Sequence, residues 1–295
     1  MKDEVVDNLI SNKSGVYLDC TLGFGGHAQE ISNNLDESGM VIGLDCDQDA
    51  FAYSKDKFKS NKKVKVFNSN YVDFENILNS LKITEIDGAI MDLGISSFQV
   101  DNHSKGFSYR IDSDLDMRFD SSYKKTAFKV LNSYSENRIS DIIKNFGEER
   151  NYKKISNSIV RFSKKNNMNT TFDLKEAITK AISYKTNMNK IFSRVFQSIR
   201  IEVNQEFQNI NKMIESLPKR IKAGGKILWI TFHSLEDRVV KKSTFKLDGT
   251  EIITTNGKKK IKLISKKVIR PSRQEILNNK RSRSAKLRGL TILEC

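Results

Sequence analysis

The sequence predicts an α/β protein with a mostly parallel, twisted sheet that is interrupted by an all-helical domain. Four short apolar runs alternate with predicted helices over residues 16–92, a pattern typical of parallel strands. Over residues 102–204 the apolar side chains recur at helical spacing instead, and a strand pattern resumes at 225–232. We therefore expect one discontinuous α/β domain, residues 1–101 and 205–295, around a helical insertion, residues 102–204.

The first apolar run ends at Asp19 and leads into a glycine-rich loop before a helix predicted at 27–35. Gly23, Gly25 and Gly26 allow a sharp turn and a close approach of the backbone to a ligand. The N–H groups that begin the next helix favour a carboxylate or a phosphate. Because the third glycine of a dinucleotide fingerprint is absent, the loop by itself fits either a tight turn or a cofactor site.

The second apolar run ends at Asp45, 26 positions after Asp19, which suits a strand–helix–strand unit. At the end of a strand, Asp45 can accept hydrogen bonds from ribose hydroxyls. Alternatively, it caps the helix predicted at 48–58. A third strand, 63–67, leads to Tyr71, which either covers an adenine ring or belongs to the core.

The fourth run ends at Asp92 and is followed by Ser96 and Gln99. The carboxyl ends of parallel strands meet at one edge of a sheet, where ligands bind. We therefore expect the carboxylates of Asp19, Asp45 and Asp92 to converge on one site.

A long apolar stripe runs from Phe192 to Leu217 in steps of three and four residues. This spacing predicts one long helix whose stripe packs into a core. Arg194, Gln197 and Arg200 lie off the stripe and are therefore free to face a cleft.

After the strand 225–232, Ser234 and Asp237 have the spacing of a capping box. That cap leaves His233 unexplained at the end of a strand, on the edge that carries the other candidate residues. His233 is therefore a further candidate site residue.

Two more strands are predicted around Gly249 and Gly257, and a basic tail follows. Residues 239–295 contain 16 Lys or Arg and four Asp or Glu, an excess of 12 positive charges in a chain whose net charge is +15. Charge gathered in this way favours a polyanionic partner, and we expect an affinity for RNA that falls steeply with salt. The alternative is a lysine-rich composition with a solvated tail.

The composition, with 38% hydrophobic residues, allows a buried core. No apolar run reaches the ~18 residues of a transmembrane helix, and the first residues do not resemble a signal peptide. The three cysteines form no Cys-x-x-Cys pair. We expect a reduced, cytoplasmic protein without a metal site or a membrane anchor.

An acid directly before an x-Gly-x-Gly loop resembles S-adenosylmethionine-dependent methyltransferases. Eight segments, in order and over nearly the whole chain, are similar to one family of them, the RsmH (MraW) family of ribosomal-RNA methyltransferases. These segments are residues 19–27, 87–97, 106–109, 115–118, 147–150, 194–204, 232–238 and 281–288.

The resemblance implies a Rossmann-like methyltransferase fold with a helical substrate-recognition insertion and S-adenosylmethionine as cofactor. It implies methylation of the exocyclic N4 of a cytidine in the decoding region of 16S ribosomal RNA, either free or in the assembled small subunit. The oligomeric state stays open between a monomer and a weak dimer. The cofactor contacts carried over from the family are Gly25, Gly26, His27, Asp45, Tyr71, Asp92 and Gln99, and the candidates around the methyl acceptor are Asp92, Ser96 and His233.

Three departures from the family pattern stand out. The family usually has a His-x-Pro-Val segment before its first helix, and this sequence starts too late to contain it, so we expect an N-terminal lid to be absent. Phe98 replaces a common proline beside Gln99 and is expected to alter that loop. Lys280 replaces another proline, with little expected effect.

Two other functions remain open at this stage. A methyltransferase acting on DNA or a small amine shares the cofactor half of the pattern but leaves the basic C-terminal segment unexplained. A catalytically silent RNA-binding or ribosome-assembly factor shares the basic segment. The acids at positions 19, 45 and 92 argue against such a silent factor.

Overall fold

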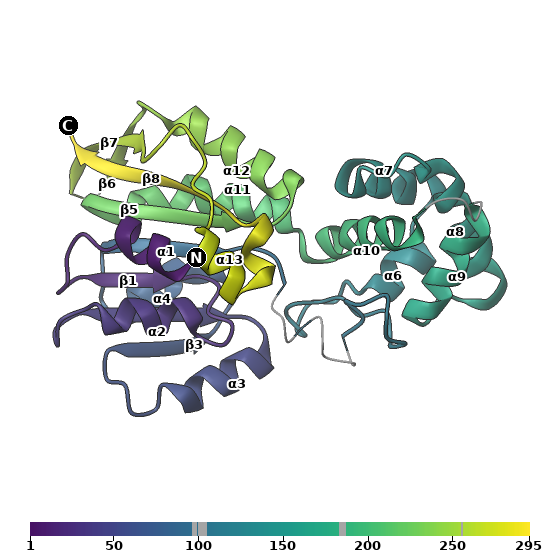
Figure 1. The fold of residues 1–295 in the computed structure, drawn as a ribbon, viewed down its shortest axis with the longest axis horizontal. Coiled ribbons are helices and arrows are strands. Elements are labelled where there is room, and N and C mark those ends of the chain that lie inside the picture. The colour runs from purple at the N-terminus through teal and green to yellow at the C-terminus, as the bar shows by residue number, and fades with distance from the viewer. Residues whose placement is uncertain (96–98, 100–104, 183–186, 255) are drawn as a thin grey trace. The chain divides into compact units, whose positions relative to one another are not determined.

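The computed structural model describes residues 1–95, 99, 105–182, 187–254 and 256–295. The chain divides into two compact units (Figure 1): Met1–Gly94 with Phe207–Cys295, and Ile95–Glu206. The sequence pattern placed these boundaries at 101/102 and 204/205, whereas the units divide at 94/95 and 206/207. Each unit has its own apolar core and is described separately below.

The first unit is built on an eight-stranded sheet with the order β3-β2-β1-β4-β5-β8-β7-β6. The five strands from β3 to β5 are parallel, and β8 and the β6–β7 hairpin continue the sheet in antiparallel pairings. This is the expected α/β class with a mostly parallel sheet. The strands are β1 (Val16–Asp19), β2 (Met40–Asp45), β3 (Val64–Asn68), β4 (Ile86–Asp92), β5 (Ile221–Thr231), β6 (Glu251–Thr254), β7 (Gly257–Leu263) and β8 (Lys286–Glu294).

Helices cover both faces of this sheet. Neighbouring strand residues point to opposite faces, so Tyr17 and Leu228 join one apolar cluster while Leu18 and Trp229 join another. The first cluster includes residues of α1 and α2, and the second includes residues of α4, α11 and α12. The helices of this unit are α1 (Lys2–Leu9), α2 (Gly26–Asn33), α3 (Gln48–Lys57), η1 (Tyr71–Asp73), α4 (Phe74–Ser80), α11 (Glu206–Ser216), η2 (Leu217–Arg220), α12 (Ser234–Leu247), α13 (Arg273–Asn278) and η3 (Lys280–Ser284).

Three aspartates end neighbouring parallel strands: Asp19 on β1, Asp45 on β2 and Asp92 on β4. The register pairs Asp19 with Gly43 of β2 and with Ile90 of β4. Asp45 and Asp92 therefore each lie two residues beyond the level of Asp19, and all three acids are at the same edge of the sheet.

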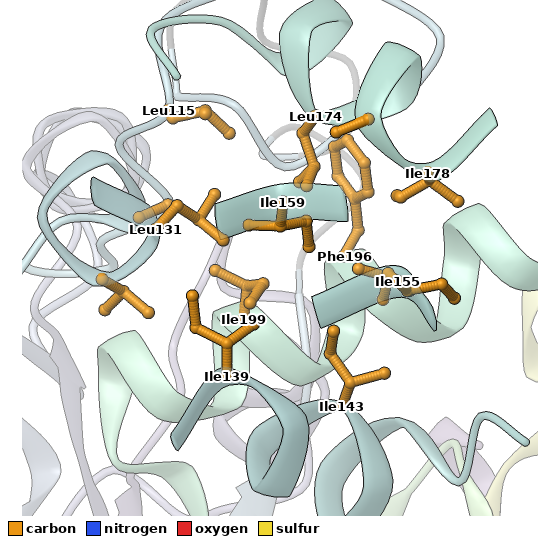
Figure 2. Close-up of a cluster of buried hydrophobic side chains, with 14 of the residues drawn as sticks. Leu115, Leu131, Ile139, Ile143, Ile155, Ile159, Leu174, Ile178, Phe196 and Ile199 are labelled. Atoms are coloured by element: carbon orange, nitrogen blue, oxygen red, sulfur yellow. The ribbon is translucent and has the colours of Figure 1, made fainter. Parts of the chain in front are cut away.

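The second unit is helical in its described residues, apart from an isolated bridge between Asp114 and Thr170. Its helices are α6 (Ala127–Ser133), α7 (Glu136–Gly147), α8 (Tyr152–Asn166), α9 (Thr171–Ala181) and α10 (Met188–Asn204). Figure 2 shows how α7, α8, α9 and α10 direct isoleucine, leucine and phenylalanine side chains into one cluster.

The single long helix predicted from Phe192 to Leu217 is wrong. The stripe divides into α10 and α11 at Gln205, whose backbone is left-handed with φ of 52°. The two halves of the stripe also belong to different cores: Phe192 packs in the helical unit and Ile214 packs against the sheet.

The basic tail is also corrected by the structure. Residues 286–294 form β8, which lies between β5 and β7 (Figure 1) and buries Leu287, Leu290 and Ile292. The C-terminal segment is therefore part of the sheet and its core.

No helix among the described residues combines the length and apolar composition that crossing a membrane requires. The same residues contain no group of three or more His, Cys, Asp or Glu side chains arranged to hold a metal ion.

Candidate active site

The loop between β1 and α2 has a backbone that requires glycine at two positions. Gly23 and Gly25 have φ of 51° and 70°, in the left-handed region that side chains disfavour. A Cβ on Gly25 would also lie 2.3 Å from the Phe58 ring. By contrast, a Cβ on Gly26 would meet no atom within 4 Å, so the first turn of α2 borders open space. The loop therefore leaves room beside the N–H groups at the start of the helix.

Asp45 holds this loop in place. Its Oδ2 accepts a hydrogen bond from the Gly23 N–H at 2.7 Å, and its Oδ1 accepts one from the Asp47 N–H at 2.8 Å. The cap of α3 is Asp47, whose carboxylate accepts from the Asp49 N–H. Asp45 is therefore not the helix cap that the sequence left open, and it joins the glycine loop to the end of β2.

Asp19 is almost completely buried, with 1% of its surface exposed. Its Oδ1 accepts a hydrogen bond from the Thr21 N–H at 3.2 Å, whereas its Oδ2 has no partner among the described residues. Burial raises the pKa of Asp19 to about 6, although the charge of His27 and the Thr21 hydrogen bond oppose that rise. The ionised carboxylate of Asp19 is thus only partly compensated within the described part of the chain.

His27 and Asp92 face each other, with His27 Nε2 3.5 Å from Asp92 Oδ2. Burial opposes the charged form of His27, but the hydrogen bond and the charge of Asp92 prevail and raise the pKa of His27 above its ordinary value. Asp92 is held by its backbone, whose N–H donates to the Thr21 hydroxyl at 2.7 Å. Thr21 is not among the residues predicted for the site, although its position directly beyond the end of β1 is a signal in the sequence that points to it.

Three buried polar atoms in this cluster lack a hydrogen-bond partner among the described residues: Asp19 Oδ2, His27 Nδ1 and Asp92 Oδ1. Buried polar atoms in native proteins are nearly always paired, so an unpaired group needs an explanation such as a ligand. Two of the three are carboxylate oxygens, which match the donors of an ammonium group. The N–H groups of α2 beside Gly26 suit a carboxylate. The cluster therefore fits the amino-acid end of S-adenosylmethionine.

Tyr71 lies in η1, immediately after β3, where its ring is half-buried against the second apolar cluster of the first unit. Tyr71 thus contacts the core, and it follows the end of β3 at residue 68 by three positions.

His233 caps α12. Its Nδ1 accepts a hydrogen bond from the Glu236 N–H at 3.3 Å, and the Glu236 carboxylate accepts from the Phe232 and His233 N–H groups. The capping box predicted for Ser234 and Asp237 is therefore wrong by one residue. The other ring nitrogen, Nε2, lies 2.7 Å from Glu236 Oε1.

Asp237 has another role. Its carboxylate accepts hydrogen bonds from Arg288 Nε at 2.7 Å and Lys286 Nζ at 3.0 Å, which joins α12 to β8. Although burial opposes ionisation, these two cations lower the pKa of Asp237 below its ordinary value.

The remaining candidates have positions in the second unit of the chain, Ile95–Glu206. Gln99 belongs to the second unit, where it is buried. Ser96 and Phe98 lie outside the described residues. Of the three residues that lie off the stripe, Arg194 is half exposed and pairs with Glu149 at 3.3 Å. Gln197 is half-buried, and its Nε2 donates to the Phe146 carbonyl at 3.2 Å. Arg200 is instead buried and pairs with Glu206 at 2.7 Å.

Comparison with known proteins assigns the chain to a family. A sequence model of the MraW methylase family matches residues 1–293. The chain belongs to the MraW methylase family. This MraW-family chain is 43% identical to ribosomal RNA small subunit methyltransferase H of Clostridium botulinum (strain Kyoto / Type A2). The alignment of 294 residues covers 97% of this chain and 95% of that protein.

Two further relatives have the same name. The protein from Caldicellulosiruptor saccharolyticus is 41% identical over 294 residues, covering 97% of this chain and 95% of the relative. The protein from Fusobacterium nucleatum subsp. nucleatum is 40% identical over 296 residues, covering 97% of this chain and 94% of the relative. Among solved structures, a putative rRNA-methylase from Clostridium thermocellum aligns with a TM-score of 0.48 and 9% identity, over 99% of this chain and 95% of that one.

Proposed function

We propose that this MraW methylase transfers a methyl group from S-adenosylmethionine to the exocyclic N4 of a cytidine in the decoding region of small-subunit (16S) ribosomal RNA. The relatives named above support the substrate class. We further propose that the protein acts in the cytoplasm, on the RNA or on the assembled small subunit. The helical unit is proposed to recognise the substrate.

The observation that carries the proposal is the cluster of Asp19, His27 and Asp92 at the edge of the parallel sheet. It combines two carboxylates, three buried atoms without partners among the described residues, and an adjoining glycine loop with open space at Gly26. We assign the ammonium group of the cofactor to Asp19 and Asp92, and its carboxylate to the first turn of α2, beside Gly25, Gly26 and His27.

The other end of the cofactor is assigned to neighbouring strand ends. Asp45 follows β2 and is proposed to accept hydrogen bonds from the ribose hydroxyls. Tyr71 follows β3, and its half-buried ring is proposed to cover the adenine. Gln99 remains a proposed cofactor contact on the strength of the family resemblance alone.

Bound S-adenosylmethionine supplies a methyl group on a positively charged sulfur. The cytosine amine is a poor nucleophile because its lone pair is delocalised into the ring, so the protein has to orient it. Asp92 is the best-suited residue, because its Oδ1 has no partner among the described residues. A carboxylate oxygen accepts two hydrogen bonds, so Oδ1 has the capacity for an amine N–H as well as for the cofactor's ammonium group. The methylated amine loses its proton readily, so a strong base is not needed.

His233 and Ser96 are weaker candidates than Asp92 for orienting the cytosine amine. His233 already caps α12 through Nδ1, which accounts for its presence without catalysis. Ser96 stays a candidate by family resemblance. The target base also has to leave its stack to reach such a site.

The first test is a methylation assay with labelled S-adenosylmethionine. The acceptors are under-methylated small subunits, free small-subunit RNA, DNA and no acceptor, followed by nucleoside analysis. We expect label in N4-methylcytidine from the small-subunit RNA. Label in DNA would support an amino-methyltransferase with another substrate, and no label with any acceptor would support a silent assembly factor; both results would contradict the proposal.

The second arm of the test replaces Asp92. We expect Asp92→Ala to lower kcat by at least about a hundredfold, because the oriented acceptor of the hydrogen bond is lost. The thermal unfolding temperature should fall only slightly, because Asp92 Oδ1 makes no contact among the described residues and the carboxylate pairs only through Oδ2, 3.5 Å from His27 Nε2. Asp56→Ala, which removes an exposed carboxylate from α3, is the matched control and should keep wild-type turnover. Near-normal turnover of Asp92→Ala would remove this residue from the mechanism.

A further inference from the structure

A groove of about 440 Å³ lies on the surface of the helical unit, between α8 and the end of α9. Its lining includes Lys154, Arg161, Phe162 and Lys165 from α8, and Lys180 from α9. We refer to this surface as the α8 groove. All residues that line it are described by the structure.

The groove lies along one face of α8. Lys154, Arg161 and Lys165 are spaced seven and four residues apart, so they share a side of the helix. Ile155 and Ile159 point the other way, into the core of the unit (Figure 2), where both are fully buried. The core therefore fixes the rotation of α8 and turns these three cations outward.

The charge of the groove is only partly compensated. Along its whole length α8 carries five Lys or Arg and no Asp or Glu. Among the described residues no carboxylate forms an ion pair with Lys154, Arg161 or Lys165, whereas Lys180 pairs with Glu176 on its own helix.

The polar neighbours of these cations are already bonded within the protein. The Ser158 hydroxyl donates to the Ala177 carbonyl at 2.6 Å, and Asn157 Nδ2 donates to Glu136 Oε2 at 3.1 Å. Two acids therefore contact residues that line the groove: Glu136, which bonds to Asn157, and Glu176, which pairs with Lys180. Lys154, Arg161 and Lys165 have no ion-pair partner among the described residues, so the groove retains an excess of positive charge.

The length of the cationic row indicates the kind of anion. Eleven residues separate Lys154 from Lys165, which is ~16 Å along a helix axis. Phosphates in one strand of a duplex are ~3.4 Å apart along the axis, so the row spans several phosphates. The half-buried Phe162 ring lies in the same groove, with Lys180 Nζ 5.6 Å from its centroid. A cationic row beside an aromatic surface is the usual arrangement for binding single-stranded nucleic acid.

We propose that the α8 groove binds the backbone phosphates of single-stranded RNA. This inference rests on the proposed function, because the RNA is taken to be a segment of the ribosomal RNA that is methylated. Lys154, Arg161 and Lys165 contact phosphates spread along the strand, and Phe162 packs against a base or a ribose. The groove positions the RNA and takes no part in methyl transfer.

The experiment compares two double variants of α8 in the full chain. Lys154→Ala/Lys165→Ala removes two cations from the groove. Lys153→Ala/Lys164→Ala removes two exposed cations that do not line it, each adjacent in sequence to one of the first pair. Both variants have the same net charge and lose side chains from the same two turns, so a difference between them reports the position of the charge. Equal thermal unfolding temperatures check that both fold.

Binding is measured with a fluorescent single-stranded RNA over a range of salt concentrations. We expect the groove variant to bind about tenfold more weakly at low salt. The slope of log K against log salt should fall by about 1.4 in magnitude, the value for two lost phosphate contacts on a single strand. The control variant should retain most of the affinity and slope. Inorganic phosphate at millimolar concentration should not displace the RNA, because it occupies only one position in the row.

Equal losses of RNA affinity in both variants would mean that only net charge matters. Wild-type RNA affinity in the groove variant would mean that its cations do not contact the RNA. Either result would contradict the inference.

The methylation assay separates this outcome from a failure of the proposed function. An active enzyme should show a raised KM and an unchanged kcat in the groove variant. If the groove variant is active with the KM of the unsubstituted protein, the proposed role of the groove is contradicted and the proposed function is not. If the unsubstituted protein is inactive, the proposed function is contradicted and RNA binding by the groove is not.

Discussion

Asp19 combines deep burial with an oxygen that lacks a partner among the described residues. Because its pKa is raised from 3.8 to about 6, ionising it at pH 7 costs the ligand-free protein about 3 kcal/mol relative to an unfolded chain. The folded state holds the proton more tightly than the unfolded chain, so this cost develops as the pH rises from about 4 to 6. A cationic group bound beside Asp19 would offset it.

This gives a prediction for ligand affinity. As the pH is raised, the affinity for S-adenosylhomocysteine should increase about tenfold per unit up to about pH 6, because the ammonium group prefers ionised Asp19. Above pH 6 the increase should be smaller, and it comes from His27: its pKa is raised above its ordinary value, so it loses its proton later, and that loss removes a competing positive charge. Titration calorimetry between pH 5 and 8 measures the profile.

Asp19→Asn provides the control for this pH profile. The amide can still accept the Thr21 hydrogen bond but does not ionise. The variant should bind more weakly at pH 7 and lose most of the slope below pH 6. An identical pH profile in the variant and the wild type would exclude Asp19 as the ammonium partner.

The positions of the acids at the sheet edge could be predicted from the sequence, whereas the hydrogen bonds of His233 could not. Asp19, Asp45 and Asp92 each end an apolar run, and parallel strands bring such ends to one edge. At the start of α12, Ser234 with Asp237 and His233 with Glu236 have the same spacing. Serine is the more common cap, but the structure uses the histidine because strand β5 ends one residue earlier than predicted.

At the scale of elements, two patterns in the sequence were misleading for physical reasons. A stripe with steps of three and four residues continues through Gln205, because one left-handed residue redirects the helix axis without altering the spacing of apolar side chains. In β8 the basic side chains dominated the prediction, although Leu287, Leu290 and Ile292 are fully buried. Pairing with strands distant in sequence gives no local signal, so the central position of β8 could not be inferred.

The central position of β8 predicts the effect of a deletion. Removing residues 286–295 takes away the strand that pairs with both β5 and β7, and with it the two cations that bind Asp237. We expect this variant to be insoluble or to lack a cooperative thermal transition in circular dichroism. Removing only Glu294 and Cys295, which are both exposed, should leave the transition almost unchanged. A soluble, cooperatively folding protein without residues 286–295 would contradict the sheet order.

At the scale of the whole molecule, the positive charge is less available than the sequence suggests. The C-terminal excess includes Lys259, whose ammonium is buried against Glu85, and Lys286 and Arg288, which bind Asp237. Such cations stabilise the fold and are not free to bind phosphate. On α8, by contrast, three cations face a groove without an ion-pair partner among the described residues. The net charge of a segment therefore does not locate a nucleic-acid interface; the pairing of each cation does.

The division into two units gives a prediction about folding. The unit Ile95–Glu206 has its own core of 22 buried apolar residues among those described, shared by α6 to α10. Expressed alone, residues 95–206 should be helical and unfold cooperatively on heating, because these core contacts are made within the unit. Circular dichroism measures the transition. Ile159→Asp, which places a charge in this core, should abolish it; a gradual, non-cooperative melt of the unsubstituted fragment would contradict the prediction.

The order of strands in the sheet has a consequence for biosynthesis. Strands β5 and β7 are translated before β8, which joins them. A nascent chain therefore exposes two unpaired strand edges between the synthesis of β7 and the arrival of β8, and such edges are prone to aggregate with other chains. This interval is when the emerging polypeptide depends most on chaperones, and slow translation of the codons between positions 264 and 286 would lengthen it.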